Sequence, residues 1–261
     1  MKRNRLRELL DAGQPTIGTH IHSTWPSIVE VVGHTGMFDY VEFVAEYVPF
    51  DLCALDNFCR AVELFDMSAM IKIEMPKRFL AQRAIGSGFQ SVLFADCHTV
   101  GDMRECVRVV RPDTPQDGGY FGAAMRRMTY VGYGGGPEYV QALRDVVIVA
   151  MIEKKSAVDH LEKILSVEGI DMVQWGPTDY SISIGRPGAR NTPEVKQVER
   201  YVIETCLEAG VPPRAEINSV DDAKYYLDMG VRHFCIGTDV VILYHWLKQN
   251  GEDLRKVILD A

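Results

Sequence analysis

The sequence predicts a (β/α)8 (TIM) barrel, built as a single domain from residues 1–261. Short apolar runs typical of buried strands alternate with amphipathic helical segments along the whole chain. Eight such strands fit within 261 residues, which is a usual length for this barrel. No Gly-x-Gly-x-x-Gly motif follows the first strand, which disfavours the alternative, a doubly wound open sheet.

The predicted elements follow one another in a regular order. Strands are expected at residues 16–21, 39–45, 70–73, 91–95, 145–151, 171–174, 213–217 and 233–236. Helices are expected at residues 6–12, 26–35, 52–67, 78–85, 100–110, 138–144, 154–167, 192–209, 219–229 and 238–247, followed by a helical tail. Gly36, Gly210 and Gly230 lie just beyond predicted helix ends, where a residue with positive φ is favoured.

Residues 111–137 interrupt this alternation. They contain Pro112, Pro115 and many glycines, including the run at 134–136, and so predict a long loop insertion. Loops of this length are often lids or assembly arms. The run lacks the Gly-x-x-x-x-Gly-Lys-Ser/Thr pattern, so we do not expect it to bind phosphate groups.

The composition excludes several classes of partner. The net charge is -8 and no long basic run is present, which argues against nucleic acid or an anionic membrane. No apolar run reaches membrane-spanning length, and the basic N-terminus lacks the apolar core of a signal peptide. Six cysteines without Cys-x-x-Cys spacing indicate reduced, mostly buried thiols in a cytoplasmic protein.

Chemically active side chains gather where the predicted strands end, which is the active face of such a barrel. The candidates are His20, His22, Glu46, Tyr47, Lys72, Glu74, Asp96, His98, Glu153, Asp179, Glu216 and Asp239. Glu153 and Asp179 follow two consecutive strands, so their carboxylates would lie side by side and suit a hard divalent cation. Spacing alone leaves a second interpretation equally open, in which Glu153 caps the next helix and Asp179 caps a turn.

Residues 149–185 contain Met-Ile-Glu-Lys, then Gly-Ile-Asp-Met, then Trp-Gly-Pro-Thr-Asp-Tyr-Ser. This stretch resembles the HpcH/HpaI family of class II pyruvate aldolases. Similar segments at residues 36–39, 88–91, 225–230 and 236–239 extend the resemblance over nearly the whole chain, in the same order. The resemblance implies a barrel whose C-terminal helix packs on a neighbouring subunit, in a homo-oligomer that is commonly a hexamer.

The resemblance also implies a set of functional residues. Glu153 and Asp179 match the family's ligands for a divalent metal ion, which is usually magnesium, manganese or cobalt. Backbone amides near Gly176, Pro177 and Thr178 would hold the carboxylate of a small 2-oxo acid substrate. The implied reaction cleaves a 4-hydroxy-2-oxo acid, or a related acidic substrate, to pyruvate and an aldehyde through a metal-bound enolate.

The residues that move protons in the family are missing, which makes this chain a divergent member. Tyr47 and Val44 stand at the positions of a His and an Asp that act as acid and base, and Gly86 stands at that of a second Asp. Lys72 replaces an Arg that steadies the keto oxygen, so the charge is kept but the two-pronged geometry is lost. Phe121 replaces the Arg of a Gly-x-Arg-Gly turn.

His20, Tyr47 and His98 are the candidates for a rebuilt acid and base, and with Lys72 they form the predicted catalytic set. Tyr47 would serve if the metal and Lys72 lowered its pKa. Three functions remain open: a metal-dependent carbon–carbon lyase for a 2-oxo acid, a lyase or hydrolase of the same superfamily with a non-pyruvate substrate, and a non-catalytic homologue. Retention of Lys72 and of the two carboxylates disfavours the third.

Overall fold

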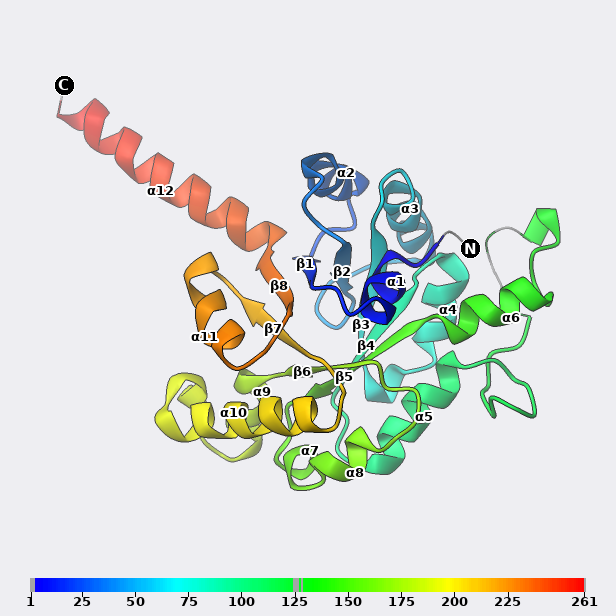
Figure 1. Cartoon of the computed structure of the whole chain (residues 1–261). Coiled ribbons are helices and arrows are strands. Elements are labelled where there is room, and N and C mark those ends of the chain that lie inside the picture. The colour runs from blue at the N-terminus through cyan, green and yellow to red at the C-terminus, as the bar shows by residue number, and fades with distance from the viewer. Residues whose placement is uncertain (1–2, 124–126, 128, 261) are drawn as a thin grey trace.

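Eight parallel strands close into a barrel, as the sequence predicts (Figure 1). The computed structural model describes residues 3–123, 127 and 129–260. The strands are β1 (Thr16–Ile21), β2 (Tyr40–Val44), β3 (Ser68–Glu74), β4 (Ser91–Ala95), β5 (Val147–Ile152), β6 (Met172–Trp175), β7 (Pro213–Ile217) and β8 (His233–Thr238). They pair in chain order, and β8 returns to pair with β1, so all carboxyl ends open at one mouth.

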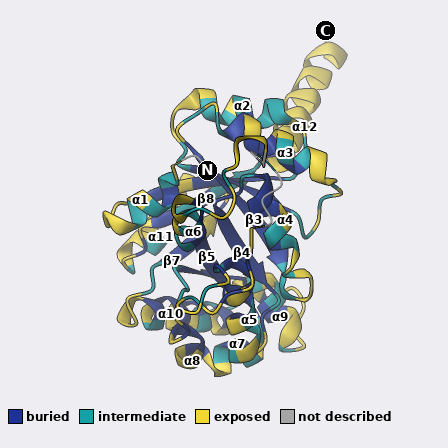
Figure 2. Ribbon diagram, turned by 90° about the vertical axis from the view of Figure 1, so that its right-hand side faces the viewer, coloured by how far each residue is buried: buried dark blue, intermediate teal, exposed yellow. Residues whose placement is uncertain are grey.

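Helices surround the barrel, and the buried strands lie inside them (Figure 2). They are α1 (Arg5–Asp11), α2 (Pro26–Thr35), α3 (Leu52–Val62), α4 (Leu80–Ser87), α5 (Val100–Val110), α6 (Pro137–Arg144), α7 (Lys155–Asp159), α8 (Leu161–Leu165), α9 (Pro177–Ser183), α10 (Pro193–Glu208), α11 (Ala223–Asp228) and α12 (Asp239–Leu259). The order of elements therefore matches the predicted alternation. Gly36 caps α2 with a φ of 67°, in the left-handed region that glycine adopts readily.

Three helical predictions were wrong in detail. The helix expected at residues 154–167 is divided into α7 and α8 at His160, whose φ of -119° leaves the helical region. Its ring Nδ1 lies 2.9 Å from the Ser156 carbonyl oxygen. Residues 177–183, where no helix was predicted, form α9, with Pro177 at a position where its missing N–H has no helical partner. The helix expected at residues 52–67 ends at Val62, and β3 begins at Ser68.

The barrel interior has an apolar half and a polar half. Met70, Leu93, Val149, Met151 and Met172, from β3 to β6, pack together in a buried cluster. The polar half comes from β1, β2, β6 and β7. It contains His20, Glu42, Gln174, Arg214 and Glu216. The cavity described below opens on this polar half.

The glycine-rich region connects α5 to β5, so it lies at the amino ends of the strands. Pro112 and Phe121 pair there in an isolated bridge, and Thr129–Val131 forms a short 3-10 helix. Arg111 anchors the region by donating to the carbonyl oxygens of Leu143 and Val146, just before β5. The described part therefore does not cover the mouth of its own barrel, and a role in assembly stays a prediction. Residues 124–126 and 128, which belong to this loop, lie outside the described residues.

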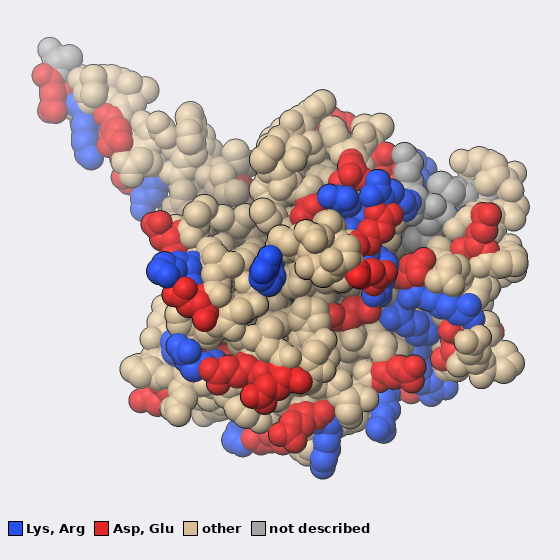
Figure 3. Space-filling view, in the orientation of Figure 1, with Lys and Arg blue, Asp and Glu red and all other residues tan. Residues whose placement is uncertain are grey.

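The C-terminal helix α12 leaves the barrel and projects away from it (Figure 1). Its first half exposes large apolar side chains, among them Ile242, Leu243, Trp246 and Leu247, which are 51–64% exposed. In Figure 3 the charged side chains of this helix appear on its distal half, which also exposes Leu254, Val257 and Ile258. The predicted helical tail is thus confirmed, and its packing on a neighbouring subunit stays a prediction. No helix in the described ranges is both long and apolar enough to cross a membrane.

Five of the six cysteines are buried and Cys53 is exposed, and all six are free thiols. The prediction that the cysteines are mostly buried is confirmed, and their reduced state stays a prediction.

Candidate active site

Glu153 follows the last residue of β5 and is only 2% exposed. Its Oε1 accepts a hydrogen bond of 2.7 Å from the backbone N–H of Asp96. Burial raises the pKa of Glu153 to about 7, against the lowering effects of that N–H group and of the Lys72 charge. Lys154, not Glu153, is the N-cap residue of α7, so the helix-capping interpretation of Glu153 was wrong.

Asp179 lies in the first turn of α9, one strand further around the barrel. Its Oδ1 is 3.5 Å from the Nζ atom of Lys154, which also lies 2.5 Å from Oδ1 of Asp96. A side-chain ammonium group therefore already stands beside two carboxylates at the strand ends. The carboxylates of Glu153 and Asp179 are hard oxygen donors at neighbouring strand ends, the donor type that a divalent ion such as Mg²⁺ prefers, so these residues fit such an ion.

Gly176 lies directly against Glu153. A Cβ atom at this position would come within 2.6 Å of the Glu153 Cβ atom and 2.9 Å of its Oε2. Its own N–H donates to the Ile152 carbonyl oxygen, and Pro177 has no N–H. The backbone N–H of Thr178 is different, because it lies in the first turn of α9, where amide groups have no acceptor within the helix. Of the three predicted substrate-binding residues, Thr178 is therefore the one whose N–H has no partner in the described chain.

Lys72 lies on β3 and is 6% exposed. Its Nζ atom is 2.8 Å from Oε2 of Glu46 and donates a 3.3 Å hydrogen bond to the Tyr47 hydroxyl group. Burial would lower the pKa of Lys72, but the charge of Glu46 and the Tyr47 hydroxyl raise it above its usual value. Lys72 thus supplies a fixed positive charge at the barrel mouth.

Tyr47 keeps its proton in this environment. Partial burial raises the pKa of its hydroxyl group to about 12, although the neighbouring Lys72 charge acts to lower it. The expected lowering by Lys72 is therefore outweighed by burial. Tyr47 is suited to donate a hydrogen bond or a proton, and not to act as a base.

His20 is a buried residue of β1, and its surroundings favour the protonated form of its ring. Its Nε2 is 3.4 Å from Oε1 of Glu42, and its Nδ1 is 3.7 Å from Oε1 of Glu216. Burial would lower the pKa of His20, but the Cys235 sulfur and the Glu42 carboxylate raise it well above its usual value. His20 lines the cavity and presents a proton donor to it.

Glu42 and Arg214 form a fully buried ion pair that the sequence analysis missed. Their side chains are 0% exposed, and the guanidinium NH1 lies 2.5 Å from the Glu42 Oε2. Arg214 also donates from Nε to Oε1 of Gln174 at 2.6 Å, and Gln174 donates to Glu216 at 3.1 Å. Opposite charges inside two predicted buried strands could have indicated this pair, because lone buried charges are rarely tolerated.

His20, Glu42 and Cys235 each offer one ligand atom, and these atoms lie within 4.8 Å of one another. The Glu42 carboxylate, however, is already neutralised by Arg214 and by protonated His20. This cluster is therefore an ion-pair network, and it is a poorer cation site than the pair of Glu153 and Asp179.

His98 does not join the other catalytic candidates. It is exposed, its Nδ1 lies 3.3 Å from the Ser156 Oγ, and it is not among the residues that line the cavity. Two further strand-end carboxylates serve the local structure. Glu74 pairs with Lys77, and Asp239 accepts the backbone N–H of His22 at 2.8 Å.

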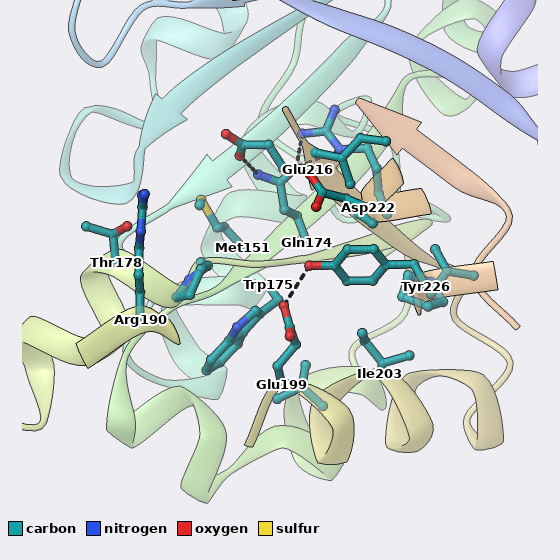
Figure 4. A pocket seen from close by; sticks show the side chains of 18 of the residues that line it. Met151, Gln174, Trp175, Thr178, Arg190, Glu199, Ile203, Glu216, Asp222 and Tyr226 are labelled. Atoms are coloured by element: carbon teal, nitrogen blue, oxygen red, sulfur yellow. Dashed lines mark hydrogen bonds between the residues drawn. The ribbon is translucent and has the colours of Figure 1, made fainter. Parts of the chain in front are cut away.

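A cavity of about 960 Å³ begins at this mouth. Lys72, Tyr47, His20 and Asp179 line it, together with Gly176, Pro177, Thr178, His22 and Glu216. From Thr178 and Arg190 it extends past Trp175 towards Tyr226 and Ile203, between α10 and α11 (Figure 4). The Tyr226 hydroxyl group donates a 2.9 Å hydrogen bond to the buried Glu199 at that far end. The structure thus brings the metal, substrate and catalytic candidates other than His98 to one side of the barrel.

Comparison with known proteins gives independent support for the family resemblance inferred from the sequence. The 5-keto-4-deoxy-D-glucarate aldolase of Klebsiella pneumoniae is 26% identical over 254 residues, which cover 97% of each chain. The hydroxypyruvate/pyruvate aldolase of Roseovarius nubinhibens is 25% identical and matches over 94% of this chain and 95% of its own. A crystal structure of a family protein from Burkholderia cenocepacia superposes with a TM-score of 0.86 at 24% identity, covering 97% of this chain and 100% of the other.

A model of one protein family matches residues 22–245, which is most of the barrel. That match and the aldolases above confirm the resemblance inferred from the motifs around Glu153 and Asp179. The chain belongs to the HpcH/HpaI aldolase/citrate lyase family.

Proposed function

We propose that this protein is a divalent-metal-dependent carbon–carbon lyase that cleaves a 4-hydroxy-2-oxo acid, or a related acidic substrate, to pyruvate and an aldehyde. The observation that carries the proposal is the pair of carboxylates, Glu153 and Asp179, which follow two neighbouring strands at the mouth of the barrel. A magnesium, manganese or cobalt ion held there would act as a Lewis acid on the 2-oxo group.

The residues around this pair suit the remaining chemistry. The Lys72 ammonium group would stabilise the negative charge that develops on the 2-oxo oxygen when the carbon–carbon bond breaks. The Thr178 N–H would bind the substrate carboxylate. His20 and Tyr47 both hold protons, so they would return one to the methylene carbon that becomes the pyruvate methyl group. The Glu216 carboxylate, which also lines the cavity, would accept the proton of the 4-hydroxyl group.

Exchange of the pyruvate methyl protons in deuterated water, followed by NMR, tests this proposal. We expect exchange that depends on Mg²⁺ in the wild-type protein and is lost in Glu153→Gln. The matched control is Asp159→Asn, which removes an exposed carboxylate that pairs with Lys155 on α7. Absence of exchange in the wild-type protein, with Mg²⁺ shown to be bound by calorimetry, would contradict the pyruvate reaction.

A second candidate is a lyase or hydrolase of the same superfamily whose substrate yields no pyruvate. The size of the cavity favours it, because about 960 Å³ far exceeds the volume of pyruvate. Arg190, Lys196 and Arg200 also line it, so a larger acid with a second anionic group would suit it. Metal binding without methyl exchange would direct a substrate screen towards such acids.

We also propose that the apolar half of α12 packs on a second copy of the chain, as part of a homo-oligomer such as a hexamer. Isolated exposure of Leu243 and Trp246 to water is unfavourable, whereas burial of such a surface in an interface is favourable. Light scattering after size-exclusion chromatography should give a multiple of the chain mass for the wild-type protein. The mass should fall for Trp246→Glu but not for Glu252→Lys in the charged half.

A further inference from the structure

Lys154 occupies an unusual position for a lysine beside a candidate metal site. Its side chain is 14% exposed, and its Nζ atom is 2.5 Å from the Asp96 carboxylate and 3.5 Å from that of Asp179. The adjacent Glu153 carboxylate is also within range of its charge. One ammonium group is therefore shared by three carboxylates. Its closest partner is Asp96, which is not a proposed metal ligand.

Asp96 is the residue that connects these groups. It has a φ of 57°, and it is the sole non-glycine residue with positive φ in the part of the chain that the structure describes. Aspartate and asparagine adopt this conformation more readily than other side chains. As a result, the Asp96 backbone N–H points to Glu153 at 2.7 Å while its carboxylate holds Lys154.

We propose that Lys154 is a built-in counter-cation that competes with the divalent ion for Asp179, and that Asp96 is a positioning residue that holds the ammonium group when the ion binds. This inference rests on the proposed function of Glu153 and Asp179. Without a positive charge, three neighbouring carboxylates would repel one another, so the lysine keeps the ligands in place. The contact with Asp179 is the longer one, so the incoming ion displaces the weaker of the two interactions.

The competition predicts opposite effects of two substitutions on metal affinity. Lys154→Met removes a positive charge near the ion, so the dissociation constant for Mn²⁺ should fall about tenfold. Asp96→Asn keeps the N–H to Glu153 and tolerates the positive φ, but it releases the ammonium group onto Asp179. The dissociation constant should then rise about tenfold.

The double variant separates this role from direct metal ligation by Asp96. If Asp96 acts through Lys154, Asp96→Asn should have little effect in the Lys154→Met background. Lys155→Met is the matched control, because that lysine is exposed and pairs with Asp159. It should leave the affinity unchanged. Lys154→Gln provides a second test of the lysine if the methionine variant proves unstable in thermal unfolding.

Titration of free Mn²⁺ followed by electron paramagnetic resonance measures these constants without any assay of activity. A Lys154→Met or Lys154→Gln variant that binds Mn²⁺ no more tightly than wild type would overturn the inference while leaving the proposed function intact. An equal loss from Asp96→Asn in both backgrounds would overturn it in favour of direct ligation. Failure of the wild-type protein to bind Mn²⁺, or binding that persists in Glu153→Gln, would overturn the proposed metal site as well.

Discussion

Replacement of Gly176 by alanine should damage the proposed metal site through a steric contact alone. The φ of Gly176 is -115°, which alanine adopts without strain, so the backbone does not oppose the change. The new Cβ would lie 2.6 Å from the Glu153 Cβ, whereas ordinary contacts begin at 3.4 Å. One of the two must therefore move by about 0.8 Å, the difference between these distances. The nearby Met151 Cε can rotate away, but the Glu153 Cβ is fixed by its backbone.

Overpacking of this kind lowers the free energy of unfolding by about 1–3 kcal/mol. Displacement of a ligand by a neighbouring residue weakens metal binding by about 10–100-fold, and we expect a loss in this range. Calorimetry with Mn²⁺ measures the affinity, and urea denaturation measures the stability. Gly136→Ala is the control, because a Cβ added there would meet no atom within 4 Å and the φ of Gly136 is -82°. If Gly176→Ala bound Mn²⁺ as tightly as Gly136→Ala, the assignment of Glu153 as a ligand would be refuted.

Three further substitutions test the charges around the cavity. Lys72→Met should lower kcat/KM for pyruvate release by on the order of a hundredfold, because it removes the ammonium group that pairs with Glu46 and faces the substrate. Lys72→Arg keeps a positive charge at this position and should restore part of the activity. Arg214→Met leaves Glu42 buried without its partner and should lower the free energy of unfolding by about 3–5 kcal/mol in urea denaturation, and a loss below about 1 kcal/mol would contradict this. The pKa of His20 is raised on folding, so its stabilising effect is complete below its unfolded pKa of about 6.5 and is lost as the pH rises through the folded value. The stability difference between wild type and His20→Gln should therefore shrink as the pH rises above about 6.5, by up to about 1.4 kcal/mol per pH unit, and a constant difference would show that His20 is not protonated.

The barrel and its active face were predictable because they follow from local patterns. Apolar runs and helical periodicity define the strands and helices, and parallel closure then places every strand end at one mouth. Glu153 and Asp179 were therefore expected near each other from their positions in the sequence. Helix boundaries were less predictable, because local side-chain contacts decide them. The break at His160 and the short helix beginning at Pro177 are examples.

The contacts that tune the site could not be read from the sequence. The left-handed conformation of Asp96, which directs its N–H to Glu153, depends on how the chain leaves β4. Opposite charges in two buried strands indicate that Glu42 and Arg214 need partners, but they lie on β2 and β7, and no local pattern shows that they pair with each other. His98 was expected in the site because it follows a strand, but its backbone N–H binds Asp102 at the start of α5, and its ring lies outside the cavity.

The buried contacts among His20, Glu42 and Arg214 indicate how the missing acid and base of the family could be replaced. A lyase must remove a proton from the 4-hydroxyl group and return one to carbon. Glu42 helps to hold a proton on His20, and Glu42 in turn stays ionised because Arg214 is fixed beside it. The raised pKa favours the charged form of His20 before substrate binds, which suits the return of a proton in the cleavage direction. By microscopic reversibility, exchange of the pyruvate methyl protons and condensation both start from neutral His20, the form that this network disfavours, so we expect both to occur but to be slower than cleavage. Cleavage is thus the direction for which we infer that the site is organised.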